Sequence, residues 1–175
     1  EIKLRKRKRI YLEDSRYFVE EVRKKVITNY GFDKVYKQGF NIKTPIDLNL
    51  QNIATKALRK GLESYDKRRG WRGPIKNKKI NKEWKKGLEK FSLERSIGWE
   101  IAIVKRIDKF ETVIETQANK IGIINNEDIN WTRKNLNQIF KIGDIIYVKK
   151  KNEGNYSLKQ VPLANGGIVV MDPYS

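Results

Sequence analysis

The stretch "WEIAIVKRIDKFETVIETQANKIGIIN" (99–125) decides the fold. It contains three short segments rich in Ile, Val and Thr and separated by turn residues, at 99–107, 110–118 and 120–125. Two further segments of the same kind follow, "DIIYVKK" (144–150) and "YSLKQV" (156–161), and Gly143-Asp144 supplies a turn before the first of them. The sequence therefore predicts five short strands.

The connection between the third and fourth predicted strands is too long for a hairpin. It carries five apolar residues that are expected to pack over one end of the strands: Ile129, Trp131, Leu136, Ile139 and Phe140. Five strands with a long third connection are typical of the OB Greek-key barrel. We therefore expect an α+β fold with a five-stranded OB-like barrel over about 99–161.

Two amphipathic helices are predicted before the barrel. The first covers 13–30 and is stopped by Gly31, with Phe18, Val22, Val26 and Ile27 on one face. The second begins after Asp47, which can cap it, and "RRGWRGP" (68–74) ends it. Its apolar residues recur at helical spacing and predict a buried stripe of Leu50, Ile53, Ala54, Ala57, Leu58, Leu62 and Tyr65.

Two apolar segments outside the barrel are predicted as short strands, "FNIKTPID" (40–47) and "GGIVVMD" (166–172). The second has no visible partner strand in the barrel. Between helix and barrel, residues 75–98 are basic and interrupted by Trp84, Leu88, Phe91 and Leu93, which indicates a loop with one short helix.

The chain is strongly basic. Among 175 residues, 39 are Lys or Arg and 21 are Asp or Glu, so the formal net charge is +18. Nucleic acid, an anionic membrane surface and an acidic protein would all be attracted, and net charge does not rank them. A codon bias towards Lys and Asn would give the same composition without any binding role. The basic run "KLRKRKRI" (3–10) is typical of a solvated or flexible segment, and contact with a membrane surface or a partner is the alternative. Charge alone predicts at most weak and non-specific contact with anionic lipid or another polyanion.

The chain has no cysteine and no histidine. This composition argues against structural zinc of the usual kind, thiol catalysis and any Ser-His relay. There is no apolar run of about 18 residues that would span a membrane. Because the sequence begins with Glu and stops just after an apolar run, we expect a piece of a longer protein. We expect no catalytic residue, metal ligand or cofactor site in it.

Two short matches to catalytic patterns are weak. "SYDK" (64–67) fits S-x-x-K, in which a Ser nucleophile precedes an activating Lys, but Ser64 is predicted at the end of a helix and the partner motifs are missing. "EDSRYF" (13–18) resembles a glycosyltransferase signature, but the His and Gly that should follow are replaced by Val19 and Glu20. Both are better explained as parts of helices.

Four longer stretches carry a stronger resemblance. They are "YFVEEVRKKVITNYG" (17–31), "GFNIKTPIDLNLQNIATKAL" (39–58), "YDKRRGWRGP" (65–74) and "FKIGDIIYVKKKNEGNYSLKQVPLANGGIVVMDPYS" (140–175). In order and spacing they resemble the central region of the class A, bifunctional penicillin-binding proteins of the 1A-like type. Pro45 and Ile46 depart mildly from the family's T-T-L-D pattern, "INWTR" (129–133) resembles its W-A-R element, and 75–98 matches least.

The resemblance implies a domain organisation. Residues 1–37 would be an interdomain linker with a helix, and 38–68 the N-terminal flank of a transpeptidase domain. An OB-like inserted domain would cover 69–161, and 162–175 would be the first strand of the transpeptidase core, upstream of its catalytic Ser. The parent would be a periplasmic peptidoglycan synthase anchored in the bacterial inner membrane, with glycosyltransferase and DD-transpeptidase activities.

By the same resemblance, this chain would be a non-catalytic docking, regulatory and spacer segment. Its partners would be cell-envelope regulatory proteins, such as activating lipoproteins, and the parent's own two catalytic domains. Arg68, Arg69 and Arg72 are hypothesised to pair with acidic groups of the transpeptidase domain. The alternative is a nucleic-acid-binding OB module, suggested by the charge and by Trp71, Trp84, Trp99 and Trp131.

Overall fold

The computed structural model describes residues 15–81 and 83–172. These residues divide into two compact units, one formed by 15–59 with 167–172 and the other by 60–81 with 83–166. The basic run at 3–10 lies outside the described residues. The elements in chain order are α1 (Arg16–Tyr30), α2 (Phe32–Lys37), α3 (Leu48–Arg68), β1 (Lys76–Asn77), η2 (Glu89–Phe91), η3 (Arg95–Ile97), β2 (Glu100–Ile107), β3 (Glu111–Thr116), β4 (Ile121–Asn125), η4 (Asn126–Thr132), α4 (Leu136–Ile139), β5 (Asp144–Asn152) and β6 (Asn155–Lys159).

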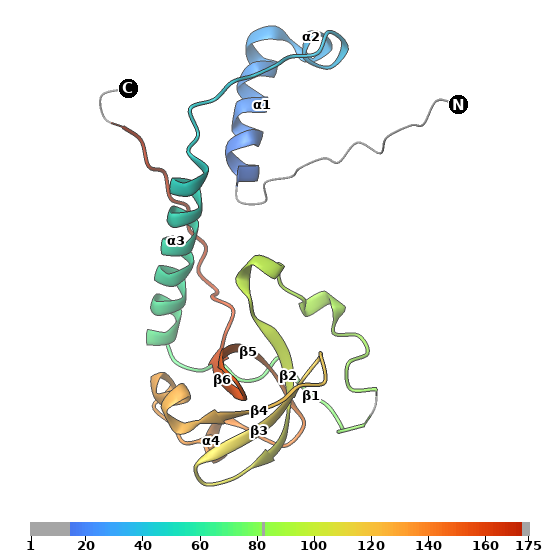
Figure 1. The fold of residues 1–175 in the computed structure, drawn as a ribbon, viewed down its shortest axis with the longest axis vertical. Helices are drawn as coiled ribbons and strands as arrows, with labels where there is room; N and C mark the ends of the chain where they lie inside the picture. The colour runs from blue at the N-terminus through green and yellow to red at the C-terminus, as the bar shows by residue number, and fades with distance from the viewer. Residues whose placement is uncertain (1–14, 82, 173–175) are drawn as a thin grey trace. The chain divides into compact units, whose positions relative to one another are not determined.

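The second unit is built on a closed barrel (Figure 1). Its strands are ordered β5-β2-β3-β4-β6, and β6 pairs back onto β5. All neighbours are antiparallel except β4 and β6, which meet in parallel at Ile123 and Asn155. This is the five-stranded OB arrangement, so the predicted α+β fold and its five strands are confirmed.

The barrel core follows from alternation along the strands. On β3, Thr112, Ile114 and Thr116 are buried while the residues between them are half-buried. β2 differs because it is buried on both faces, which explains its unbroken apolar run "IAIV". Its neighbours Ala102 and Val104 face the barrel core, whereas Ile101 and Ile103 belong to a second cluster outside the barrel.

The long connection between β4 and β5 closes one part of the barrel core. η4 and α4 bury Ile129, Leu136, Ile139 and Phe140, and Trp131 packs against them. The prediction that this connection packs down onto the strands is confirmed.

Residues 75–98 form a cover over the outer face of β2 and β5. Trp84 and Leu88 are buried there with Ile101, Ile103 and Ile145. The Lys78 ammonium donates hydrogen bonds to the carbonyls of Trp84 and Lys86, which holds the loop closed. The sequence predicted a loop with one short helix. The cover instead has the two-residue strand β1, paired with β5, and the two short 3₁₀ helices η2 and η3.

The helix boundaries agree with the sequence signals. α1 ends at Tyr30, where Gly31 adopts a positive φ of 81°. α3 begins after Asp47, whose Oδ1 accepts hydrogen bonds from the backbone N–H groups of Asn49 and Leu50 at 2.7 and 3.1 Å.

Three expectations were wrong. The segments 40–47 and 166–172 are not strands, because the part of the chain that the structure describes provides no strand to pair with either of them. The apolar stripe of α3 is also not buried along its whole length. Leu50, Ile53, Ala57 and Tyr65 are exposed, and Ala54, Leu58 and Leu62 are only half-buried, since a periodic apolar face only predicts burial when another surface covers it.

Candidate functional site: the clamp at the end of helix α3

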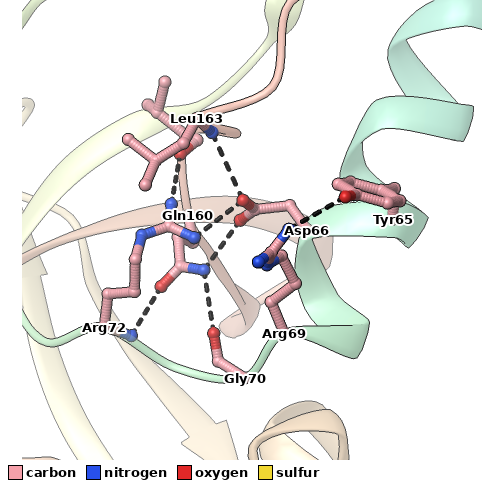
Figure 2. Close-up of polar contacts among 8 residues, drawn as sticks. Tyr65, Asp66, Arg69, Gly70, Arg72, Gln160 and Leu163 are labelled. Atoms are coloured by element: carbon pink, nitrogen blue, oxygen red, sulfur yellow. Dashed lines mark hydrogen bonds and ion pairs between the residues drawn. The ribbon is translucent and has the colours of Figure 1, made fainter.

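The last turn of α3 contains one carboxylate among several cations. In "YDKRRGWR" (65–72) the acidic residue is Asp66, and it is only 2% exposed. Its Oδ1 accepts hydrogen bonds from Arg72 Nη1 at 2.7 Å and from the Leu163 backbone N–H at 3.3 Å. Its Oδ2 accepts one from Gln160 Nε2 at 2.7 Å (Figure 2). A buried carboxylate is thus fully surrounded by donors, as burial requires.

Arg72 and Gln160 extend the network to the backbone. Arg72 Nη2 donates to the Val161 carbonyl at 2.7 Å, and the Arg72 backbone N–H donates to Gln160 Oε1 at 2.8 Å. Gln160 Nε2 also donates to the Gly70 carbonyl at 3.1 Å. Gly70 has a φ of 87°, so it supplies the left-handed turn that brings Arg72 back beside Asp66. The chain entering the barrel and the chain leaving it are therefore bonded to each other.

A second ion pair lies one helical turn earlier. Lys159 Nζ is 2.6 Å from Glu63 Oε2, and the two side chains are only 12% and 25% exposed. The same ammonium lies 5.3 Å from the centroid of the Trp99 ring. Because Glu63 and Asp66 are three residues apart, they share one face of α3 and meet the consecutive residues Lys159 and Gln160. We call Glu63, Asp66, Arg72, Lys159 and Gln160 the clamp.

The electrostatics of the clamp favour the ionised acid. Burial opposes the charge on Asp66, but the hydrogen bonds from Arg72 and Gln160 outweigh it and hold the pKa of Asp66 below its ordinary value. Nearby, burial and then the like charge of Lys159 lower the pKa of Lys67. The Lys67 ammonium lies 5.6 Å from the centroid of the Trp131 ring.

This arrangement can hold two chain segments together, and its groups are already engaged with one another. Ser64, the residue of the weak S-x-x-K match, lies inside α3 rather than at the start of a helix. Within residues 15–81 and 83–172, no group of three or more Asp or Glu side chains is placed to hold a metal ion.

Two expectations about "YDKRRGWRGP" are corrected. Arg72 was hypothesised to pair with acids of another domain, but its partner is Asp66 of the same unit. Tyr65 was expected to be buried, but it is exposed, and its Oη accepts a hydrogen bond from Arg69 Nη1 at 2.9 Å. Sequence reasoning missed Asp66 and Gln160. The available signal was a single acid within a basic run directly before a glycine.

In the part of the chain that the structure describes, no helix is both long enough and apolar enough to cross a membrane.

Comparisons with known proteins agree with the barrel and its attachments. The profile of the family described as penicillin-binding protein OB-like domain matches residues 71–164, more than half of the chain. The chain therefore belongs to this family of penicillin-binding proteins.

Its relatives are of the 1A type. Penicillin-binding protein 1A of Rickettsia felis is 33% identical over 180 residues, which cover 98% of this chain and 22% of the relative. The protein of the same name from Pseudomonas aeruginosa is 28% identical over 172 residues, covering 90% of this chain and 20% of the relative. The chain thus spans about a fifth of the length of these curated relatives.

A solved structure shares the fold. The crystal structure of penicillin-binding protein 1A from Haemophilus influenzae superposes with a TM-score of 0.64 at 25% identity, covering 83% of this chain and 22% of that chain. The resemblance seen in the sequence, a 1A-like OB-like region of a class A penicillin-binding protein, is confirmed.

Proposed function

We propose that this chain is a non-catalytic spacer and docking segment of a bifunctional peptidoglycan synthase, with glycosyltransferase and DD-transpeptidase activities, in cell-wall biosynthesis. Its membership of the penicillin-binding protein family supports the parent activity. The parent protein is periplasmic and anchored in the inner membrane, and the chain comprises a linker (1–37), a transpeptidase flank (38–68), the OB-like domain (69–161) and the start of the transpeptidase core (162–175).

The clamp is the observation that carries the spacer role. Asp66 on α3 and Leu163 after β6 are joined directly, and Arg72 bonds to both Asp66 and the Val161 carbonyl. The clamp holds the barrel where the chain enters it and where the chain leaves it, so the barrel cannot move freely relative to the last turns of α3. A cell-envelope protein docked on the barrel would then act on the last turns of α3. Such an effector changes activity only if it binds two states of the synthase unequally.

The nucleic-acid alternative receives little support from the tryptophans. Stacking on bases requires exposed ring faces. Trp71 and Trp131 pack on the barrel core, and Trp84 is buried in the second cluster. The Trp99 ring has the Lys159 ammonium 5.3 Å from its centroid and the Tyr147 ring at a centroid distance of 6.3 Å. We therefore expect single-stranded DNA to bind weakly and without base preference. Base-selective binding at micromolar or tighter levels in about 0.15 M salt would favour the alternative.

The spacer role is tested in the full-length synthase carrying Glu63→Gln with Asp66→Asn. We expect labelling by a fluorescent penicillin to be unchanged, because the clamp is not part of a transpeptidase site. We expect cross-linking of newly made glycan to fall about fivefold or more, the lower range of coupling between distant sites. Asp33→Asn, which removes a solvent-exposed pair with Lys37, is the control. Unchanged cross-linking, or loss of penicillin labelling, would contradict the proposal.

A further inference from the structure

Three loops of the barrel meet at one edge. Asn126 Nδ2 donates to the Lys109 carbonyl at 3.3 Å, which joins the start of η4 to the β2–β3 loop. The Ile123 backbone N–H donates to the Gly154 carbonyl at 2.8 Å, which joins β4 to the β5–β6 loop. We call residues 108–111, 125–128 and 151–155 the loop edge. In OB folds, this combination of loops with the face of the second and third strands binds oligonucleotides or oligosaccharides.

The loop edge has an apolar strip beside it. On the outer face of β3 and β4, Val113 pairs with Ile123, and both side chains are half-buried. One step towards the loops, Glu111 pairs with Asn125. Phe110, at the tip of the β2–β3 loop, is 70% exposed, with the Lys109 ammonium 5.4 Å from the centroid of its ring. A single exposed aromatic next to a short aliphatic strip offers a surface for the C–H face of a small ring, but no track of stacking rings.

The polar groups of the loop edge are mostly amides and carboxylates. It carries four asparagines, Asn125, Asn126, Asn152 and Asn155. The Asn125 Nδ2 to Asn155 Oδ1 bond is long, at 3.5 Å, and so is the Asn155 Nδ2 to Glu153 carbonyl bond, at 3.4 Å. Weakly engaged amides retain the capacity to donate to and accept from a ligand. A sugar hydroxyl both donates and accepts, so it is matched by this set.

The charge at the loop edge opposes that of the whole chain. Within its three segments, the acids are Asp108, Glu111, Glu127, Asp128 and Glu153, and the bases are Lys109 and Lys151. Lys151 pairs with Asp128 at 2.8 Å, and Arg106, just before the first segment, pairs with Asp108 at 2.9 Å and with Glu111 at 3.8 Å. With Arg106 counted, five acids face three bases. A chain with a net charge of +18 thus presents a small acidic excess at the position where OB folds bind ligands. Phosphate-backed ligands are disfavoured there, since their binding depends on cationic contacts.

We propose that the loop edge binds a neutral oligosaccharide, with Phe110, Val113 and Ile123 contacting the sugar faces and the asparagine amides and Glu111 bonding to hydroxyl or acetamido groups. This inference goes beyond the proposed function and does not rest on it. The residue chemistry alone defines the ligand class.

The test is a titration of the 175-residue chain with the tetrasaccharide of N-acetylglucosamine, followed by backbone amide NMR. We expect shifts confined to 108–113, 123–128 and 151–155, with weak binding of about millimolar Kd, because Phe110 is the one strongly exposed aromatic ring of the loop edge. Phe110→Ala should weaken binding about fivefold or more. Ile121→Ala is the matched control, because Ile121 is a 60% exposed apolar residue at the opposite end of β4, and it should bind like wild type.

Two outcomes would overturn the inference. One is the absence of shifts at saturating tetrasaccharide, or an equal loss in Phe110→Ala and Ile121→Ala. The other is tighter binding of a single-stranded oligothymidylate at the same amides. Neither result tests the clamp, so the glycan site can be refuted without refuting the spacer role. Conversely, tetrasaccharide binding with unchanged cross-linking in the clamp variants would refute the spacer role alone.

Discussion

Asp66 and Arg72 form a 2.7 Å ion pair in which the acid is almost fully buried and the base is about one-third exposed. The two residues are separated by a glycine turn, and both also bond to the segment that follows β6. The pair therefore connects three chain segments: the end of α3, the turn that follows it and the segment after β6.

Asp66→Asn should destabilise the chain by about 1–3 kcal/mol, because it removes a charge-assisted bond and leaves Arg72 without its carboxylate. Urea unfolding followed by tryptophan fluorescence measures this. Asp33→Asn is the matched control, because its pair with Lys37 is exposed and should contribute about 0.5 kcal/mol or less. An equal loss of unfolding free energy in the two variants would show that the buried pair contributes no more to stability than the exposed pair.

The contribution of Asp66 should depend on pH in one direction. Its pKa is lowered in the folded chain, so its stabilisation is fully present above the unfolded value of about 4 and disappears as the pH falls through the lower folded value. The difference in melting temperature between wild type and Asp66→Asn should therefore be constant near neutrality and shrink below about pH 4. A difference that grows on acidification would refute the assignment.

Gly122→Ala should destabilise the barrel by about 1–3 kcal/mol through overpacking. A Cβ there would lie 2.4 Å from the buried Tyr156 ring and 2.9 Å from the Gly154 carbonyl. Gly61→Ala is the contrasting variant, since Gly61 lies within α3 with nothing within 4 Å of the added Cβ. It should stabilise the helix by up to about 1 kcal/mol. Thermal unfolding of both variants checks the sign of each change.

Trp84→Ala should cost about 3–5 kcal/mol, because this residue is 3% exposed and anchors the cover to the outer face of β2. Hydrogen exchange should then accelerate across 75–98 before the barrel strands open. Phe110→Ala, at an exposed loop tip, should leave stability within about 0.5 kcal/mol of wild type. Slow exchange at 75–98 in Trp84→Ala would mean that the cover does not depend on this side chain.

The strands of the barrel could be predicted because their pattern is local. Ile, Val and Thr at alternate positions with turn residues between them indicate strands wherever a core exists. The cover over β2 was harder to predict from the sequence. The apolar run "IAIV" indicates a strand with both faces buried, but it does not indicate that Trp84 and Leu88 cover one of them. The clamp could not be predicted, since Asp66 and Gln160 are 94 residues apart and nothing in the sequence around either one indicates that the two bond to each other.

Three predictions were wrong for a common reason. They concern the apolar face of α3, expected to be buried, and the segments 40–47 and 166–172, expected to be strands. Periodicity and β-propensity report a capacity to be buried or paired, and the partner is needed to realise it. Family membership suggests that the partner is the transpeptidase domain, and this remains a prediction.

The central claim is that the clamp fixes the last turns of α3 on the barrel. The chain has no cysteine, so Lys60→Cys and Lys149→Cys can carry two spin labels, one on α3 and one on β5. Pulsed electron–electron double resonance measures the distribution of distances between them. We predict a narrow single distribution in the otherwise wild-type chain and a broad one when Glu63→Gln and Asp66→Asn are added. A distribution that is already broad with the clamp intact, or that is unchanged when the clamp is removed, would contradict the account.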